Sequence, residues 1–228
     1  MTLAEVKEGA VLLVDKPLTW TSFDVVNKIR AALQLKKVGH AGTLDPLASG
    51  LLILCTSRMT KQISEFQNLV KTYTGCITLG ATTPSFDLET QFNHTYPTTH
   101  LTKKNIEAAA QAFVGWQQQT APAYSAVKQQ GKRNFERARR GEKVPDKNRW
   151  IKVENFELTK IDLEKPMPEV HFSITCIKGT YIRTIANDFG KYLNCGAHLS
   201  LLRRTAIGNN SVNDALDVDE LINQLKGS

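Results

Sequence analysis

The chain has 228 residues, of which 41% are hydrophobic and 22% charged. These proportions are typical of a globular protein and exclude a disordered or fibrous one. The four cysteines form no CxxC pair and no Cys/His cluster with zinc-ligand spacing, so we expect free thiols in a reduced compartment and no metal. No signal peptide is recognisable and residues 47–55, the most apolar stretch, are too few to cross a membrane. The sequence therefore predicts a cytoplasmic protein without a membrane partner.

Helical and strand patterns alternate along the chain. In chain order, we expect a strand over 11–14, a helix over 22–33, a strand over 51–54 and a helix over 60–69. A strand over 72–80, a helix over 102–113, strands over 150–163 and 170–177, a helix over 182–193 and a strand over 199–207 follow. Ser22 is the expected cap of the first helix, whose apolar stripe includes Phe23, and Asp217 with Glu220 caps a C-terminal helix. The irregular alternation favours an α+β fold with helices packed on a mixed sheet over a doubly wound parallel sheet.

The segment 38–50, VGHAGTLDPLASG, has the strongest chemical signal. Its glycines permit close approach of a ligand, and Pro46 holds Asp45 out of the helical region so that the carboxylate projects from a loop. By itself Asp45 also fits an Asx turn, and His40 also fits an ordinary turn residue. The residue pattern alone leaves both interpretations open.

Positive charge is concentrated in one segment. Residues 128–152 hold ten Lys or Arg against three acids, which equals the net charge of +7 of the whole chain. A neutral body with one basic segment predicts a polyanionic partner. A solvated helix face is the alternative.

The segment GHAGTLDPLASGLL closely resembles the catalytic loop of the TruB-type tRNA pseudouridine synthases. Five further motifs match the family in the same order: DKP with WTS at 15–22, KTY at 71–73, YSAVK at 124–128, KGTYIRT at 178–184 and LRR at 202–204. The resemblance implies the pseudouridine synthase fold, in which helices flank a central mixed, mostly antiparallel sheet. It also implies one catalytic domain over 1–228, with a basic thumb at 129–149 inserted in it.

The resemblance further implies a reaction. The family isomerises uridine to pseudouridine in the T loop of tRNA, at position 55, on a flipped-out uridine and without a metal or cofactor. Asp45 matches the nucleophile, and a carboxylate can attack either C1′ of the ribose or C6 of the base. Arg183 matches the guanidinium that favours the charged carboxylate, although a surface helix arginine is the alternative. Tyr73 matches the tyrosine that stacks on the target base and takes part in removing the C5 proton.

Other matched residues imply tRNA binding. His40 resembles the histidine that fills the space left by the flipped nucleotide, and Leu202 the apolar wall of the uracil pocket. Lys16 and Lys61 either contact phosphate or face water. The thumb residues expected to grip the phosphates of the T arm are Lys132, Arg137, Arg139 and Arg140.

Three departures from the family pattern stand out. Thr19 replaces a glycine that many members have, and residues 81–87 lack the Asp-rich pattern of better-known bacterial members. About twenty residues follow Ile207, which is too few for the C-terminal PUA domain of many members.

We expect a monomer without an obligate protein partner. The alternatives to the synthase are a non-catalytic tRNA-folding chaperone on the same scaffold, or the same chemistry on another RNA.

Overall fold

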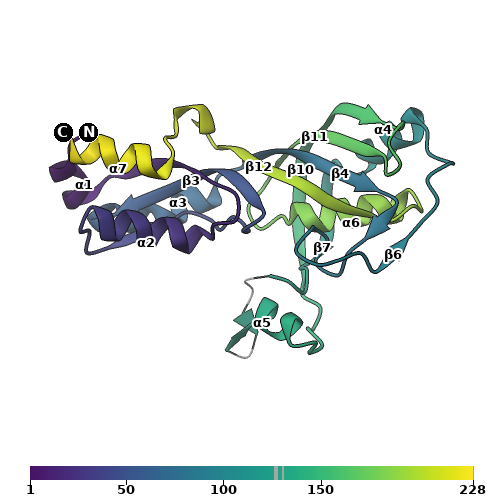
Figure 1. Cartoon of the computed structure of the whole chain (residues 1–228), viewed down its shortest axis with the longest axis horizontal. Helices are drawn as coiled ribbons and strands as arrows, with labels where there is room; N and C mark the ends of the chain where they lie inside the picture. Colours follow the sequence, from purple (N-terminus) through teal and green to yellow (C-terminus); the bar gives the residue numbers. More distant parts are fainter. Residues whose placement is uncertain (126–127, 130, 228) are drawn as a thin grey trace. The chain divides into compact units, whose positions relative to one another are not determined.

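The computed structural model describes residues 1–125, 128–129 and 131–227. The chain divides into two compact units, Met1–Thr74 with Leu202–Ser228, and Gly75–Leu201. The nine-stranded sheet has the order β1 (Val11–Lys16), β3 (Ala48–Thr56), β12 (Ala197–Ile207), β4 (Lys71–Leu79), β11 (Glu169–Cys176), β10 (Asn148–Asp162) and β7 (Gly115–Thr120), with β2 (Val38–His40) on β3 and β13 (Asn210–Ser211) on β12. Figure 1 labels β3, β12, β4, β11, β10 and β7. β3 and β12 are parallel, whereas the pairs β1–β3, β10–β11 and β7–β10 are antiparallel. The predicted α+β fold with a mixed sheet is therefore confirmed.

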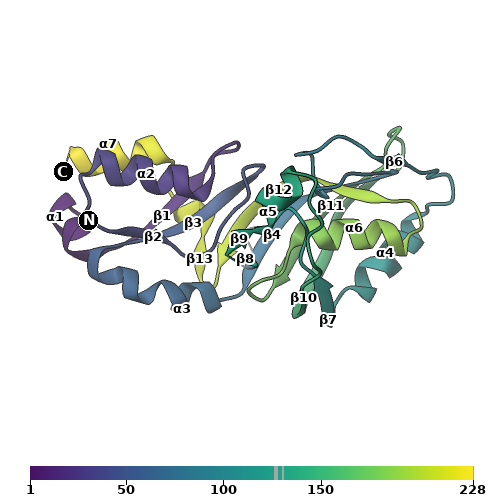
Figure 2. The same cartoon turned by 90° about the horizontal axis from the view of Figure 1, so that it is seen from below.

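The first unit contains the strands β1 (Val11–Lys16), β2 (Val38–His40), β3 (Ala48–Thr56) and β13 (Asn210–Ser211). Its helices are α1 (Leu3–Gly9), α2 (Ser22–Ala32), α3 (Ile63–Asn68) and α7 (Val218–Lys226), with short 3₁₀ turns η1 (Ser57–Gln62) and η2 (Val212–Asp214). Figure 2 shows α2 and α7 side by side, and their apolar faces join the alternately buried residues of β1 in one core. Representative members of this core are Leu12, Val14, Ile29, Leu221 and Leu225.

The second unit contains β7 (Gly115–Thr120), β10 (Asn148–Asp162) and β11 (Glu169–Cys176), with the small strands β5 (Ala81–Thr82) and β6 (His94–Thr95). Helices α4 (Lys103–Ala112) and α6 (Ile182–Tyr192) belong to the same unit. Its core is aromatic, because the ring centroid of Phe156 lies 5.6 Å from that of Phe189 and 6.0 Å from that of Phe172. The segment between β7 and β10 carries β8 (Lys128–Gln129), β9 (Lys132–Arg133) and α5 (Asn134–Arg139).

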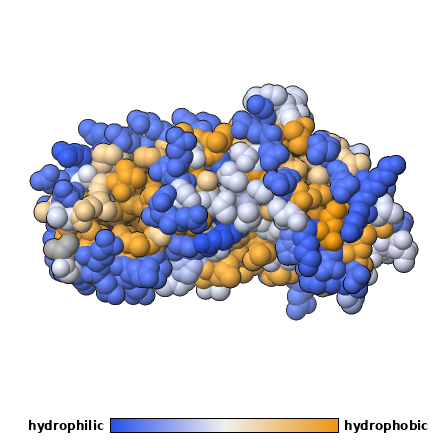
Figure 3. Space-filling model, turned by 90° about the horizontal axis from the view of Figure 1, so that it is seen from above, coloured by the Kyte–Doolittle hydropathy of each residue, from blue (hydrophilic) through white to orange (hydrophobic). Residues whose placement is uncertain are grey.

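β4 (Lys71–Leu79) and β12 (Ala197–Ile207) contribute residues to both units, since the division falls within each strand. On the face that Figure 3 displays, hydrophilic residues are interspersed with apolar patches. Among the described residues, no helix combines the length and the apolar character needed to cross a membrane.

The start of α2 differs from the prediction. Thr21, not Ser22, is the N-cap, because Thr21 and Asp24 form a capping box. Phe23 is 61% exposed, so its assignment to the apolar stripe was wrong. Val26 and Ile29 of the expected stripe are buried, together with Val25.

Two other helical predictions need correction. The helix expected over 60–69 is a 3₁₀ turn followed by the six-residue α3. Ser57, at the start of that turn, has a φ of +43°, and the Thr60 hydroxyl donates to the carbonyl of Ser57. Helix α1 was missed, although Thr2 and Glu5 form a capping box that the sequence displays.

Candidate active site

Asp45 lies in the loop between β2 and β3, and its side chain is half-buried. The loop is tied to the start of α2, because the Ser22 hydroxyl accepts from the Leu44 N–H at 2.9 Å and donates to the Leu44 carbonyl at 3.2 Å. The carbonyl of Asp45 accepts from the Ala48 N–H at 3.0 Å. The buried Ser22 hydroxyl is engaged with Leu44 in the loop. The neighbouring Thr21 therefore caps the helix in its place.

Arg204 on β12 holds the other side of the same loop. Its guanidinium donates to the carbonyls of Leu51 at 2.7 Å, Gly42 at 3.2 Å and Thr43 at 3.4 Å. The residue is only 1% exposed. A planar group with five fixed donors suits this task, since it reaches several carbonyls at once. The sequence identified Arg204 as part of a motif but missed this positioning role.

Close backbone packing makes that arrangement possible. Gly50 on β3 pairs with Arg204 on β12, and a Cβ at Gly50 would lie 2.3 Å from the Arg204 backbone oxygen. Gly50 also has a φ of +104°, a conformation that favours glycine. Glycine is therefore required at this position for both reasons.

Lys16 is completely buried at the end of β1. Its Nζ donates to the carbonyls of Pro17 at 2.8 Å and Trp20 at 2.6 Å. Burial lowers the pKa of Lys16 to about 8, with Asp45 acting to raise it and Arg204 to lower it. Both roles expected for Lys16, phosphate contact and exposure to water, disagree with this burial. The side chain instead braces the segment before α2 and contributes positive charge near Asp45.

The remaining predicted residues of the first unit have different environments. His40 ends β2, its Nδ1 has no hydrogen-bond partner in the described part of the chain, and burial lowers its pKa. Leu202 is 8% exposed and pairs with Ala48, three residues after Asp45. Tyr73 is half-buried on β4, and Lys61 is exposed in the turn η1.

Arg183 belongs to the second unit, near the start of α6, and is 4% exposed. Its Nε lies 3.4 Å from Oδ2 of Asp87, and it donates to the carbonyls of Ser85 at 2.9 Å and Tyr124 at 2.7 Å. The surface-arginine alternative is therefore wrong. Sequence reasoning missed Asp87, which is 5% exposed and lies in the 81–87 segment that departs from the family pattern.

The basic thumb carries exposed guanidinium groups on and after α5. Arg139 forms an ion pair with Glu89 at 2.7 Å and lies over the ring of Phe135, and Arg140 lies 3.9 Å from Glu142. Arg137 is half-buried on the same helix. The side chain of Lys132 is outside the described residues, as are Ala126 and Val127 of the motif that leads into the thumb.

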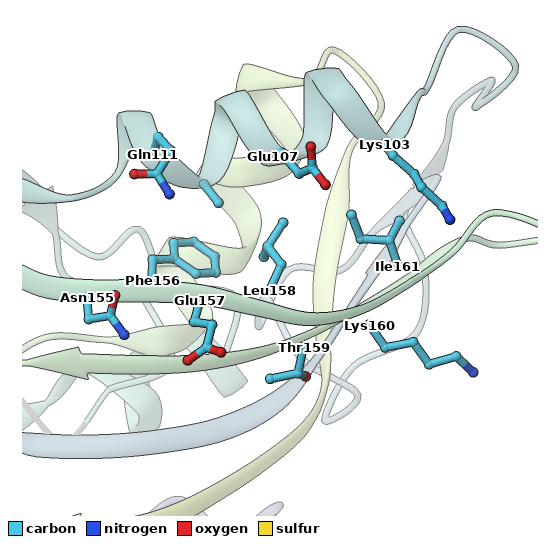
Figure 4. Close-up of a pocket in the computed structure, with 11 residues that line it drawn as sticks. Lys103, Glu107, Gln111, Asn155, Phe156, Glu157, Leu158, Thr159, Lys160 and Ile161 are labelled. Carbon is cyan, nitrogen blue, oxygen red and sulfur yellow. The ribbon is translucent and has the colours of Figure 1, made fainter.

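Two hollows of the second unit contain none of the predicted site residues. One, of about 430 Å³, lies between α4 and β10, where Figure 4 shows Lys103 and Glu107 on the helix and Phe156 and Leu158 on the strand. The other, of about 580 Å³, is lined by segments around Thr82, His94 and Asn187. The chemical groups of the candidate site thus lie outside both hollows.

Known proteins match almost the whole length of the chain. The model of the TruB family pseudouridylate synthase N-terminal domain matches residues 30–182, and that of the tRNA pseudouridylate synthase B C-terminal domain matches residues 183–226. The chain is 48% identical over 225 residues to tRNA pseudouridine synthase B of Flavobacterium johnsoniae, covering 96% of each chain. It is 50% identical over 219 residues to the protein of the same name from Phocaeicola vulgatus, covering 93% of this chain and 92% of the relative.

Solved structures show the same fold. A chain in the crystal structure of a Cbf5-Nop10-Gar1 complex superposes with a TM-score of 0.71 at 27% identity, over 96% of this chain. The match spans 55% of that chain, so this protein covers about half the length of its structural relative. The two domain models and the nearly full-length relatives establish that the chain belongs to the TruB family of pseudouridylate synthases.

Proposed function

We propose that this chain isomerises uridine to pseudouridine at position 55 in the T loop of tRNA, with Asp45 as the nucleophile. The observation that carries the proposal is the half-buried Asp45 carboxylate on a loop fixed from two sides, by Ser22 and by Arg204. Such a fixed nucleophile lowers the entropic part of the barrier. Family membership and the names of the nearly full-length relatives support the reaction and the RNA class.

The reaction breaks the N1–C1′ bond of uridine and forms a C5–C1′ bond, after which the C5 proton leaves. Asp45 attacks either C1′ or C6, and both routes fit an ionised carboxylate. The family resemblance assigns Arg183 the role of charge partner of the nucleophile, and Tyr73 the roles of stacking on the base and assisting removal of the C5 proton. The target base must leave its stack to be reached. Leu202 then forms the apolar wall of the pocket that receives the uracil, and His40 fills the space that the flipped nucleotide leaves in the RNA.

By the same resemblance, residues 1–228 are one catalytic domain, in which residues 129–149 bind the phosphates of the T arm. The positive charge comes from three arginines, of which Arg139 and Arg140 are exposed and Arg137 is half-buried. Exposed guanidinium groups suit contacts with the backbone of a folded RNA. The protein acts as a monomer in the cytoplasm, a location supported by its four free cysteines.

The test of the reaction is tritium release from 5-tritiated uridine in an unmodified tRNA transcript. Forming the C5–C1′ bond expels the C5 hydrogen, so release reports the isomerisation directly. We expect release by the wild type and by Asp219→Asn, an exposed control in the same unit. Asp45→Asn should bind the tRNA and release none.

Each outcome has a definite reading. Release by Asp45→Asn would remove this residue as nucleophile. Tight tRNA binding without release by the wild type would favour the chaperone. Release from another RNA alone would keep the chemistry and change the substrate.

The thumb has a separate test. Changing Arg137, Arg139 and Arg140 to Gln should weaken tRNA binding and reduce the slope of log affinity against log salt, because fewer counterions are released. The control variant changes three exposed lysines outside the thumb, Lys103, Lys104 and Lys160, to Gln. Equal effects in both triple variants would indicate a general charge effect and contradict a dedicated thumb.

A further inference from the structure

A cluster of three possible metal ligands lies on β4 and β11 of the second unit, separate from the residues assigned to the reaction. The cluster consists of Cys76, Glu169 and His171, whose donor atoms all lie within 4.8 Å of one another. We propose that these three side chains form a binding site for a divalent transition-metal ion, with Zn²⁺ as the preferred ion and water as the fourth ligand.

The distances between the donor atoms fit such an ion. Sγ of Cys76 lies 3.9 Å from Nε2 of His171, which lies 3.5 Å from Oε2 of Glu169. Metal–ligand distances of about 2.3 Å for sulfur and about 2.1 Å for nitrogen and oxygen give tetrahedron edges of about 3.6 Å and about 3.4 Å. The two measured separations exceed these edges by only a few tenths of an ångström. The third pair of donor atoms, on Cys76 and Glu169, lies within 4.8 Å, so rotation of the Glu169 side chain toward the thiol is the main adjustment needed to bring the three groups to one ion.

The backbone holds the ligands on one polar face of the sheet. Glu169 and His171 alternate along β11 with Val170 and Phe172, which are buried in the core, so the two ligands share the opposite face. Cys76 lies on β4, the neighbouring strand. Because regular strands fix the ligand positions, little backbone ordering is needed when the ion binds.

Polar groups surround the thiol. The hydroxyls of Ser200 and Thr78 lie beside the Cys76 thiol. The Thr78 hydroxyl donates to Ser200 at 2.8 Å, and the Ser200 hydroxyl donates to the Cys76 carbonyl at 3.2 Å. Such outer hydrogen bonds orient ligands and tune metal sites. The thiol proton passes to solvent when the metal–sulfur bond forms.

Solvent reaches the site, and the Lys165–Glu169 ion pair that competes with metal binding is exposed. The side chains of His171 and Glu169 are 35% and 25% exposed, which leaves room for water and for entry of the ion. Glu169 currently accepts from Lys165 at 2.7 Å, but Lys165 is 46% exposed and can turn into solvent. An exposed ion pair of this kind contributes little to stability. A thiolate, imidazole and carboxylate set selects Zn²⁺ or Co²⁺ over Mg²⁺ and Ca²⁺.

The experiment uses Co²⁺ as a spectroscopic probe of the full chain after metal removal. We expect one equivalent of Co²⁺ to produce a thiolate-to-cobalt charge-transfer band and tetrahedral d–d bands, which Zn²⁺ abolishes and Mg²⁺ does not. Cys76→Ser should lose the charge-transfer band. The matched control Cys176→Ser changes a buried core thiol on β11 and should retain it.

Two surface variants keep the test decisive if Cys76→Ser does not fold. His171→Gln and Glu169→Gln change half-buried side chains, and each should weaken Co²⁺ binding by about 10–100-fold. Absence of the charge-transfer band in the folded wild type, or its persistence in folded Cys76→Ser, would overturn the proposal. So would unchanged affinity in both surface variants.

Discussion

Replacing Arg204 with Met tests whether this buried guanidinium positions the loop that carries Asp45. Methionine is of similar length but has no donor, so the carbonyls of Leu51, Gly42 and Thr43 lose the bonds at 2.7, 3.2 and 3.4 Å. A hydrogen bond to a charged group contributes about 1.5–3 kcal/mol. The two longer bonds count for less, and removing a buried cation recovers desolvation energy.

We therefore expect Arg204→Met to lower the free energy of unfolding by about 3 kcal/mol. For a chain of this size, that change corresponds to a fall in Tm of about 6–12 °C. The catalytic effect should be separable, because displacement of a catalytic group by about 1 Å can cost about 100-fold in rate. We expect single-turnover tritium release to fall by about that factor while the Kd for tRNA changes little.

The matched control is Arg203→Met on the same strand. Arg203 forms a bidentate pair with Asp15 and is 38% exposed, so its loss should cost at most about 1 kcal/mol. Arg204→Lys should restore part of the stability and rate, because an ammonium keeps the charge but not the planar fork. Wild-type turnover by Arg204→Met, below its melting temperature, would refute the positioning role.

Three further predictions concern backbone space, buried charge and pH. Gly50→Ala should lower the free energy of unfolding, measured in urea, by about 3 kcal/mol more than Gly115→Ala. The two glycines have similar positive φ, but only a Cβ at Gly50 would clash with backbone atoms. Equal losses of unfolding free energy in the two variants would refute the clash. Asp87→Asn should lower the free energy of unfolding by about 3–5 kcal/mol, because it removes a buried carboxylate paired with Arg183. A loss under about 1 kcal/mol in the same urea assay would show that this charge is dispensable. Burial lowers the folded-state pKa of Lys16 from 10.5 to about 8, so the unfolded chain binds more protons between these values and stability should rise with pH there, relative to Lys16→Met. Urea unfolding of both proteins at pH 7.5 and 9.5 checks the sign, and a fall would contradict it.

The sequence predicted features that depend on neighbouring residues. The 38–50 segment displays its glycines, its proline and its carboxylate together, so a ligand-accessible loop followed by a buried strand could be inferred from local chemistry. The cap of α7 at Asp217 was predicted for the same reason and is confirmed. At α2 the same reasoning chose Ser22 over Thr21, because nothing local reveals that the Ser22 hydroxyl is bonded to Leu44.

Long-range contacts explain what the sequence could not predict. The Arg204 guanidinium reaches carbonyls more than 150 positions earlier in the chain, and the ion pair of Arg183 with Asp87 joins residues almost 100 positions apart. Spacing rules for metal sites describe ligands close in sequence. They therefore give no signal for Cys76 and His171 of the proposed metal site, which adjacent strands bring together across 95 positions.

Buried cations in the first unit share one kind of partner, the backbone carbonyl. Lys16, Lys71 and Arg204 are each at most 6% exposed, and each donates to two or three backbone carbonyls. A carbonyl partner satisfies the donors without cancelling the charge, so a cation held in this way fixes the backbone and leaves positive potential around it. The lowered pKa of Lys16 is the cost of this arrangement, since burial and Arg204 both disfavour its proton. Around Asp45, Lys16 and Arg204 thereby combine hydrogen-bonded backbone with positive charge, which suits both the proposed carboxylate nucleophile and the phosphates of an RNA substrate.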